Sequence, residues 1–168
     1  VVKGCITEYG SGEPLEGAVV YLTGGSGAGG TFVDSVITDS EGFYYLESDL
    51  DPVYFDVFAT GNLYYAGESI TGVIKRKENT INIVLDPVGW IHYRVFNESG
   101  EGTLFWNSIC PEMPSTIWGG ADLDFTCPVH ANRNYQINYW INDGVNDVPY
   151  QDDPYIAGHD TLYYEIIF

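Results

Sequence analysis

The chain has 168 residues, enough for one large domain or two small ones, and its net charge of −18 comes from 24 acidic against 6 basic side chains. This excess argues against nucleic acid as a partner, because binding phosphates requires clustered Lys and Arg. An apolar fraction of 45% argues against disorder, and no apolar run reaches the length of a membrane-spanning helix.

The first half of the chain is predicted to form short strands separated by turns. Apolar and polar side chains alternate within each segment, and Gly, Pro and Asp stand between the segments. No long segment shows the helical period of about 3.6 residues, so we expect almost no helix. The alternation predicts strands at residues 2–7, 17–23, 32–38, 42–48, 53–60, 67–74 and 79–85.

A domain boundary is expected at Asp86–Pro87, directly after the last of these strands. Proline cannot donate a hydrogen bond to a strand ladder, and it biases the residue before it toward extended geometry. The first domain is then residues 1–86 and the second is residues 87–168.

Three segments of the first domain carry a more specific pattern. They read VKGCIT at residues 2–7, GEPLEGAVVYL at 12–22 and TDSEGFYYL at 38–46. With these motifs, residues 1–86 resemble the carboxypeptidase regulatory-like domain, a transthyretin-like β-sandwich that is similar to the Cna-B-like domains. The resemblance implies a non-catalytic scaffold of secreted and cell-surface proteins.

The sequence shows no catalytic constellation. None of His92, His130 and His159 is followed three positions later by Glu, so the His-x-x-Glu zinc pair of the carboxypeptidases is absent. No paired acid and base is legible elsewhere. We therefore expect that the chain is not an enzyme.

The second half restarts with strands. In the first of them, alternation turns Ile91, Tyr93 and Val95 toward the core. Trp90, His92, Arg94 and Phe96 then share the opposite face. Further strands are predicted at 103–107, 122–127, 134–142 and 161–168, after the first at 89–97.

These patterns together predict an all-β chain with almost no helix. We expect two small antiparallel β-sandwich domains in tandem, of immunoglobulin-like or transthyretin-like type. The order of motifs along the whole chain resembles small exported two-domain proteins of Bacteroidetes-type bacteria.

The cysteines suggest one disulfide. Cys110 and Cys127 are 17 positions apart, and closing such a loop would contribute about 3 kcal/mol by restricting the unfolded chain. Cys5 is then left over. In an alternating strand it is most simply a small buried residue, and an intermolecular bridge is the alternative.

An acidic segment in the second half is a candidate calcium site. Calcium takes several oxygen ligands from a flexible turn, which Asp, Asn and Gly supply. A solvated acidic loop is the alternative, and no other cofactor is expected. The candidate ligands are Asp143, Asn146, Asp147, Asp152 and Asp153.

Our main functional hypothesis is a self-associating structural protein of an extracellular fibre or filament. The segments Val1–Thr7 and Thr161–Phe168 are predicted terminal strands, and such strands can add to the sheet edge of a neighbour. The partner would be a homo-oligomer or filament. The apolar side chains expected to make this contact are Leu162, Tyr164, Ile166 and Phe168.

The alternative hypothesis is a surface binding module for carbohydrate or protein. It rests on 14 Tyr and 4 Trp, of which Trp106 and Trp118 could stack on sugar rings. These two Trp could instead cover loops while Trp90 and Trp140 fill the core. Under both hypotheses the chain is read as a mature product without its export signal, located outside the cell or on its surface.

Overall fold

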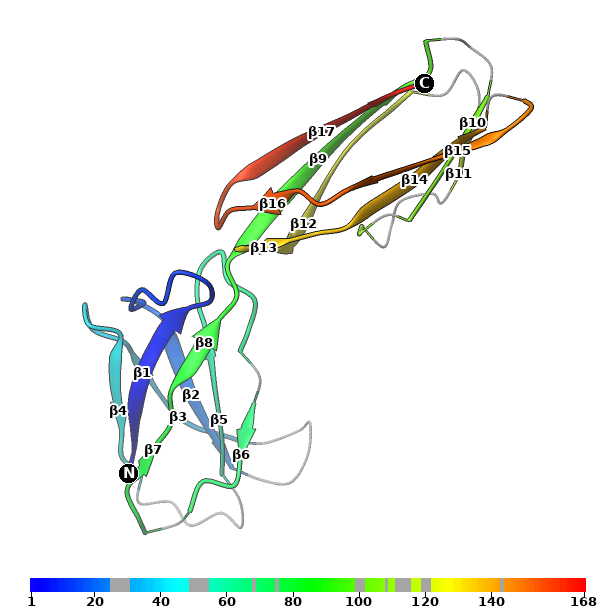
Figure 1. Cartoon of the computed structure of the whole chain (residues 1–168). Coiled ribbons are helices and arrows are strands. Elements are labelled where there is room, and N and C mark those ends of the chain that lie inside the picture. Colours follow the sequence, from blue (N-terminus) through cyan, green and yellow to red (C-terminus); the bar gives the residue numbers. More distant parts are fainter. Residues whose placement is uncertain are drawn as a thin grey trace. The chain divides into compact units, whose positions relative to one another are not determined.

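The computed structural model organises the described residues into two compact units, Val1–Pro87 (unit 1) and Val88–Phe168 (unit 2). The regular elements of both units are strands (Figure 1). Within the described part of the chain, no helix could span a membrane. The structure describes residues 1–24, 31–48, 55–67, 69–74, 76–98, 102–107, 109–110, 116–118, 122–142 and 144–168.

Unit 1 is a sandwich of two sheets. One sheet has the order β4-β1-β7, with β8 also pairing with β1, and the other has the order β3-β2-β5-β6. The strands are β1 (Val2–Glu8), β2 (Val19–Gly24), β3 (Thr31–Ile37), β4 (Phe43–Leu46), β5 (Phe55–Thr60), β6 (Ile70–Thr71), β7 (Asn79–Thr80) and β8 (Ile83–Leu85).

The core of unit 1 lies between these sheets and follows the alternation in the sequence. In β1 the burial alternates, so Val2, Gly4 and Ile6 face inward. The same period in β2 and β5 supplies the opposite wall. The buried apolar side chains are Val2, Ile6, Ala18, Val20, Leu22, Tyr44, Leu46, Phe55, Val57, Ala59, Ile83 and Leu85.

The TDSEG motif forms the turn before β4, and two of its residues have specific structural roles there. The carboxylate of Asp39 accepts hydrogen bonds from the N–H groups of Glu41 (3.0 Å) and Phe43 (2.8 Å). Gly42 has φ +70°, and a Cβ on it would lie 2.5 Å from the carbonyl oxygen of Ile6. Only glycine fits this close approach without strain, so the turn holds β4 against β1.

Unit 2 is a second sandwich. Its sheets have the orders β11-β10-β14-β15 and β12-β9-β17, and a two-stranded sheet pairs β13 with β16. The strands are β9 (Val88–Phe96), β10 (Thr103–Asn107), β11 (Thr116–Trp118), β12 (Leu123–His130), β13 (Arg133–Asn134), β14 (Ile137–Asn142), β15 (Asp147–Asp152), β16 (Tyr155–Ile156) and β17 (Thr161–Ile167).

The core of unit 2 is built around β9. Ile91, Tyr93 and Val95 are fully buried, which confirms the face predicted from alternation. The ring of Tyr93 meets Trp106 edge to face at 4.8 Å and Tyr164 at 5.9 Å. These aromatic contacts join the two sheets, since Trp106 lies on β10 and Tyr164 on β17.

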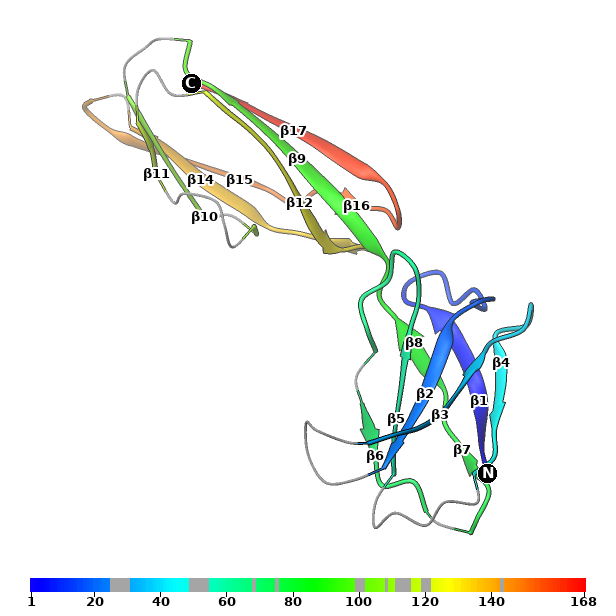
Figure 2. The same cartoon turned by 180° about the vertical axis from the view of Figure 1, so that it is seen from behind.

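Strand pairing differs from a purely antiparallel plan at two places. β1 pairs parallel with β7 and β8, and β17 pairs parallel with β9. β1 is also paired with β4 on its other side, so Val1–Thr7 is not a free terminal strand, and this corrects the prediction for that segment. β17, by contrast, is an edge strand in both views (Figures 1 and 2).

Two buried tyrosines offer a matched test of the packing. The Tyr44 hydroxyl donates to the carbonyl oxygen of Ile81 at 2.7 Å, whereas the buried hydroxyl of Tyr93 has no hydrogen-bond partner among the described residues. Tyr44→Phe should therefore lower the free energy of unfolding by about 1 kcal/mol, because it orphans a carbonyl. Tyr93→Phe should leave it unchanged or raise it by a similar amount.

Chemical denaturation followed by circular dichroism measures the free energy of unfolding of the Tyr44→Phe variant, whose substitution lies in unit 1. Tryptophan fluorescence isolates Tyr93→Phe, because all 4 Trp lie in unit 2. Equal losses in the two variants would contradict the assignment of hydrogen-bond partners.

Candidate interaction site

The free edge of β17 is the most open backbone feature of the described structure. The carbonyl oxygen of Asp160 accepts from the N–H of Trp90 at 2.9 Å, and the N–H of Phe168 donates to the Phe96 carbonyl at 3.0 Å. Backbone groups of every second residue in a strand point to the same side. The N–H and C=O groups of Tyr163, Glu165 and Ile167 therefore point away from β9, where no described strand pairs with them.

The side chains predicted to make a self-association surface are turned inward instead. Ile166 is buried, and Leu162, Tyr164 and Phe168 pack against the core of unit 2. The cause is the period of two residues: the apolar set of β17 faces its own sandwich and fixes the strand there. The outward set includes Tyr163 and Ile167, which are 75% and 50% exposed.

Tyr164 also ties β17 to the other sheet of unit 2. Burial raises the pKa of Tyr164, and the nearby charge of Asp152 on β15 raises it further. The hydroxyl also donates a hydrogen bond to that carboxylate. This contact joins the edge strand β17 to the edge strand β15 of the other sheet.

The other edges carry features that discourage pairing. β12 contains Pro128, and β15 contains Pro149 between two Asp residues. In unit 1, the pairing of β3 with β2 is irregular after Leu22, and β3 also carries Asp34. The remaining edge strands are four residues long or shorter: β4, β6, β7, β8, β11, β13 and β16. β17 has seven residues with neither Pro nor Gly, and its register with β9 is unbroken.

The structure places Trp106 where it cannot stack on a sugar. Its side chain is only 4% exposed and packs in the core of unit 2. The strand predicted at 103–107 is β10, and it alternates so that Leu104 and Trp106 both face inward. The side chain of Trp118 lies outside the described part of the structure. Trp140, expected to fill the core, is 40% exposed on β14.

The predicted calcium ligands do not converge. Asp147 and Asp152 are at opposite ends of β15, so their backbones are about 16 Å apart at the usual rise of a strand. Asp147 instead accepts a hydrogen bond from the side chain of Asn142 at 2.7 Å. Asn146 lies before the strand and Asp153 beyond its other end. The segment forms a hairpin with β14 rather than one loop.

No group of three or more His, Cys, Asp or Glu side chains that could hold a metal ion occurs among the described residues. Asp143 lies outside them, and calcium binding there stays a prediction.

Cys110 and Cys127 form a disulfide whose Cα atoms are 6.1 Å apart. Both residues are buried in the core of unit 2, so the bond ties the segment after β10 to β12 in the facing sheet. Cys5 has a free thiol on the outward side of β1 and is half-buried. It is thus neither fully buried nor bridged within the chain.

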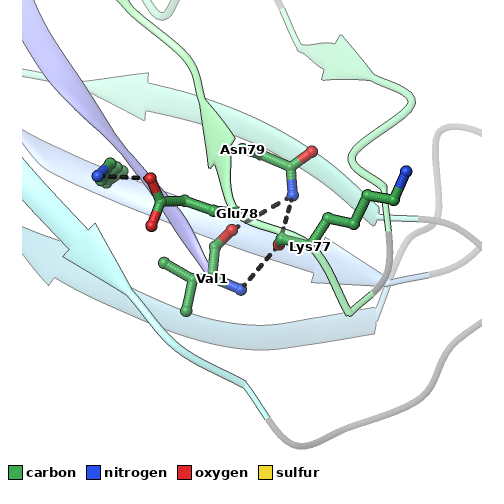
Figure 3. A network of polar contacts seen from close by, with 5 residues as sticks. Val1, Lys77, Glu78 and Asn79 are labelled. Atoms are coloured by element: carbon green, nitrogen blue, oxygen red, sulfur yellow. Dashed lines mark hydrogen bonds and ion pairs between the residues drawn. The ribbon is translucent and has the colours of Figure 1, made fainter.

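A cavity of about 430 Å³ opens at one end of unit 1, between the two sheets. Its rim is organised by Asn79, whose carboxamide donates to the carbonyl oxygens of Val1 (3.2 Å) and Lys77 (3.1 Å) (Figure 3). The same carboxamide also donates to the carbonyl oxygen of Ile74 (3.0 Å). Next to it, the ammonium of Lys3 pairs with the carboxylate of Glu78 at 2.6 Å. These contacts fix the loop before β7.

A second hollow, of about 380 Å³, lies on the outward face of the sheet β12-β9-β17. The imidazole of His92 is 2.8 Å from the hydroxyl of Thr126 through Nδ1 and 3.4 Å from the carboxylate of Asp124 through Nε2. Arg94 pairs with Glu165 at 3.7 Å. This hollow is therefore lined by polar side chains that hold one another in place.

No family model and no curated protein matches the chain. Solved structures that it resembles include the shaft pilin SpaA of Lactobacillus rhamnosus, at 9% identity and TM-score 0.43, and the minor pilin of Streptococcus agalactiae, at 10% and 0.40. Each match covers 99% of this chain and 95% of the other. The TIE protein of Bacillus anthracis matches at 12% and 0.40, and the chain spans 33% of its length. At these identities and TM-scores, the likenesses assign no activity or assembly to this chain.

The disulfide should stabilise unit 2 alone. Replacing both cysteines (Cys110→Ala with Cys127→Ala) should lower the free energy of unfolding of this unit by about 3 kcal/mol, the value for a loop of this length. Denaturation followed by tryptophan fluorescence measures the change. Cys5→Ala is the matched control and should leave the fluorescence transition in place. A double variant as stable as the parent would contradict a structural role for the bond.

Proposed function

We propose that the chain is a non-catalytic structural protein of the cell surface, whose copies associate through the free edge of β17. The observation that carries this proposal is the row of outward backbone groups on a seven-residue strand without Pro or Gly. Soluble proteins usually protect such an edge with Pro, bulges or short strands, as the other described edges of this chain do. An edge left open is a template for a strand of another copy.

The packing of β17 supports this role. Because Ile166 is buried and Tyr164 is anchored to Asp152, the strand is held rigidly in its own unit while its edge stays open. A rigid template loses little entropy when a second strand pairs with it. Two β17 strands pairing edge to edge would join two three-stranded sheets into one continuous sheet.

Growth into a fibre needs a second contact, because one self-complementary contact closes at a dimer. The outward face of the sheet β3-β2-β5-β6 supplies a candidate. Tyr21 and Phe58 stack there with ring centroids 4.9 Å apart. On the same sheet Phe32 and Ile37 are 59% and 65% exposed. We propose that this apolar face stacks on a neighbouring copy and extends the assembly.

The disulfide supports a location outside the cytoplasm. Disulfides persist in oxidising compartments such as the cell exterior and are rare where thiols are kept reduced. The net charge of −18 keeps single copies soluble until specific contacts form.

Ile167→Pro tests the edge directly. Proline removes an outward N–H without touching the bonds to β9, and Ile166 before it is already extended. We expect the variant to stay monomeric at concentrations where the parent associates, as measured by sedimentation velocity. Ile167→Ala is the control: it removes the same side chain but keeps the N–H, and it should still associate.

Electron microscopy of the assembled parent tests the fibre. Ile37→Asp should stop growth beyond the dimer while leaving the β17 contact intact. A parent chain that stays monomeric at high concentration would contradict self-association, and an Ile167→Pro variant that assembles normally would contradict the role of β17.

A further inference from the structure

The outward face of the sheet β12-β9-β17 has a regular arrangement of side chains that the structural role does not use. The strand register aligns these side chains in rows across the three strands. One row is Thr126, His92 and Tyr163, and the next is Asp124, Arg94 and Glu165. We call these two rows the polar rows. Trp90 and Phe96 lie on β9 at either end of them.

The polar rows bring hydrogen-bonding groups together. His92 contacts Thr126 and Asp124, and the half-exposed side chains of Arg94 and Glu165 lie 3.7 Å apart. One hollow of about 380 Å³ contains strong acceptors and donors of hydrogen bonds. The acceptors are the two carboxylates, and the donors are the guanidinium and the imidazole. Pockets that take small ligands measure roughly 300–1,000 Å³, so the hollow has the size of a small-molecule site.

Aromatic rings stand beside these polar groups. Tyr163 is 75% exposed, and its ring lies 5.1 Å from the imidazole of His92. The guanidinium of Arg94 lies 4.3 Å from the centre of the Phe96 ring. An exposed aromatic ring offers a flat apolar surface at low conformational cost, with a polar tip in the case of Tyr.

We propose that the polar rows, together with Tyr163, bind a neutral carbohydrate. A sugar presents an apolar face of C–H groups, which stacks on an aromatic ring. Its hydroxyl groups both donate and accept hydrogen bonds. Carboxylates accept from them and a guanidinium donates to them, so a site with both groups side by side suits a sugar. The Tyr163 ring and the Asp124–Arg94–Glu165 row supply this combination.

Charge argues against other ligands for this face. Arg94 is flanked by a carboxylate on each side in its row, which disfavours phosphate, sulfate or another anion. A second copy of the same face would bring together two surfaces that each carry two carboxylates and one guanidinium, and this excess of like charge repels. A neutral polyol avoids both penalties.

Native gel electrophoresis in the presence of soluble polysaccharide tests the inference, because the acidic protein migrates readily. Dextran, mannan, xylan and galactan are the probes, each compared with a gel that lacks polysaccharide. We expect at least one of them to retard the parent chain. Tyr163→Ala should weaken that binding by about tenfold, which corresponds to loss of one aromatic stacking contact.

The matched control is Tyr155→Ala. Tyr155 is 56% exposed on β16, away from the polar rows, so this variant should be retarded like the parent. Arg94→Gln should weaken retardation as well, since it replaces the charged guanidinium fork between the carboxylates with a shorter neutral amide. The proposal is overturned by a parent that none of the four polysaccharides retards, by equal losses in Tyr163→Ala and Tyr155→Ala, or by retention on heparin alone. None of these results depends on whether copies associate, because the gel without polysaccharide records the assembly state.

Discussion

The unpaired backbone at the edges of its open sheets is the constraint on which the rest of this structure depends. A sandwich of this size has edge strands on every sheet, and each unpaired N–H and C=O group needs water or a partner. Most edges here are short, acidic, irregular or interrupted by Pro. β17 is long and regular, and the packing of Ile166 and Tyr164 against the core holds the strand in its sheet while its outer edge stays unpaired. The proposed assembly follows from this contrast between edges.

Local periodicity was enough to predict most of the strands and much of the core. The alternation in β9 correctly separated Ile91, Tyr93 and Val95 from the outward side chains. The turn before β4 was legible because Asp39 and Gly42 have side-chain and backbone requirements that few other residues satisfy. Strand alternation and turn motifs depend only on residues close together in the chain, so they can be recognised in a single sequence.

Pairing between distant strands could not be predicted in this way. Alternation alone gives a strand two faces but no neighbour, so the position of β1 between β4 and β8 was missed. The same reason hid the polar rows, which join side chains from β9, β12 and β17. The acidic composition of β15 hid its pairing, so a paired strand was interpreted as a loop. The strand of Trp106 was predicted, but alternation did not say which of its two faces points to the core.

Hydrogen exchange at the amides of β17, measured by NMR at several protein concentrations, tests the central claim most directly. Leu162, Tyr164 and Ile166 point their N–H groups to β9 and should be protected at every concentration. Tyr163, Glu165 and Ile167 should exchange rapidly in dilute protein and become protected as copies associate. Protection of these three amides in the dilute monomer, or rapid exchange in the assembled state, would contradict the account.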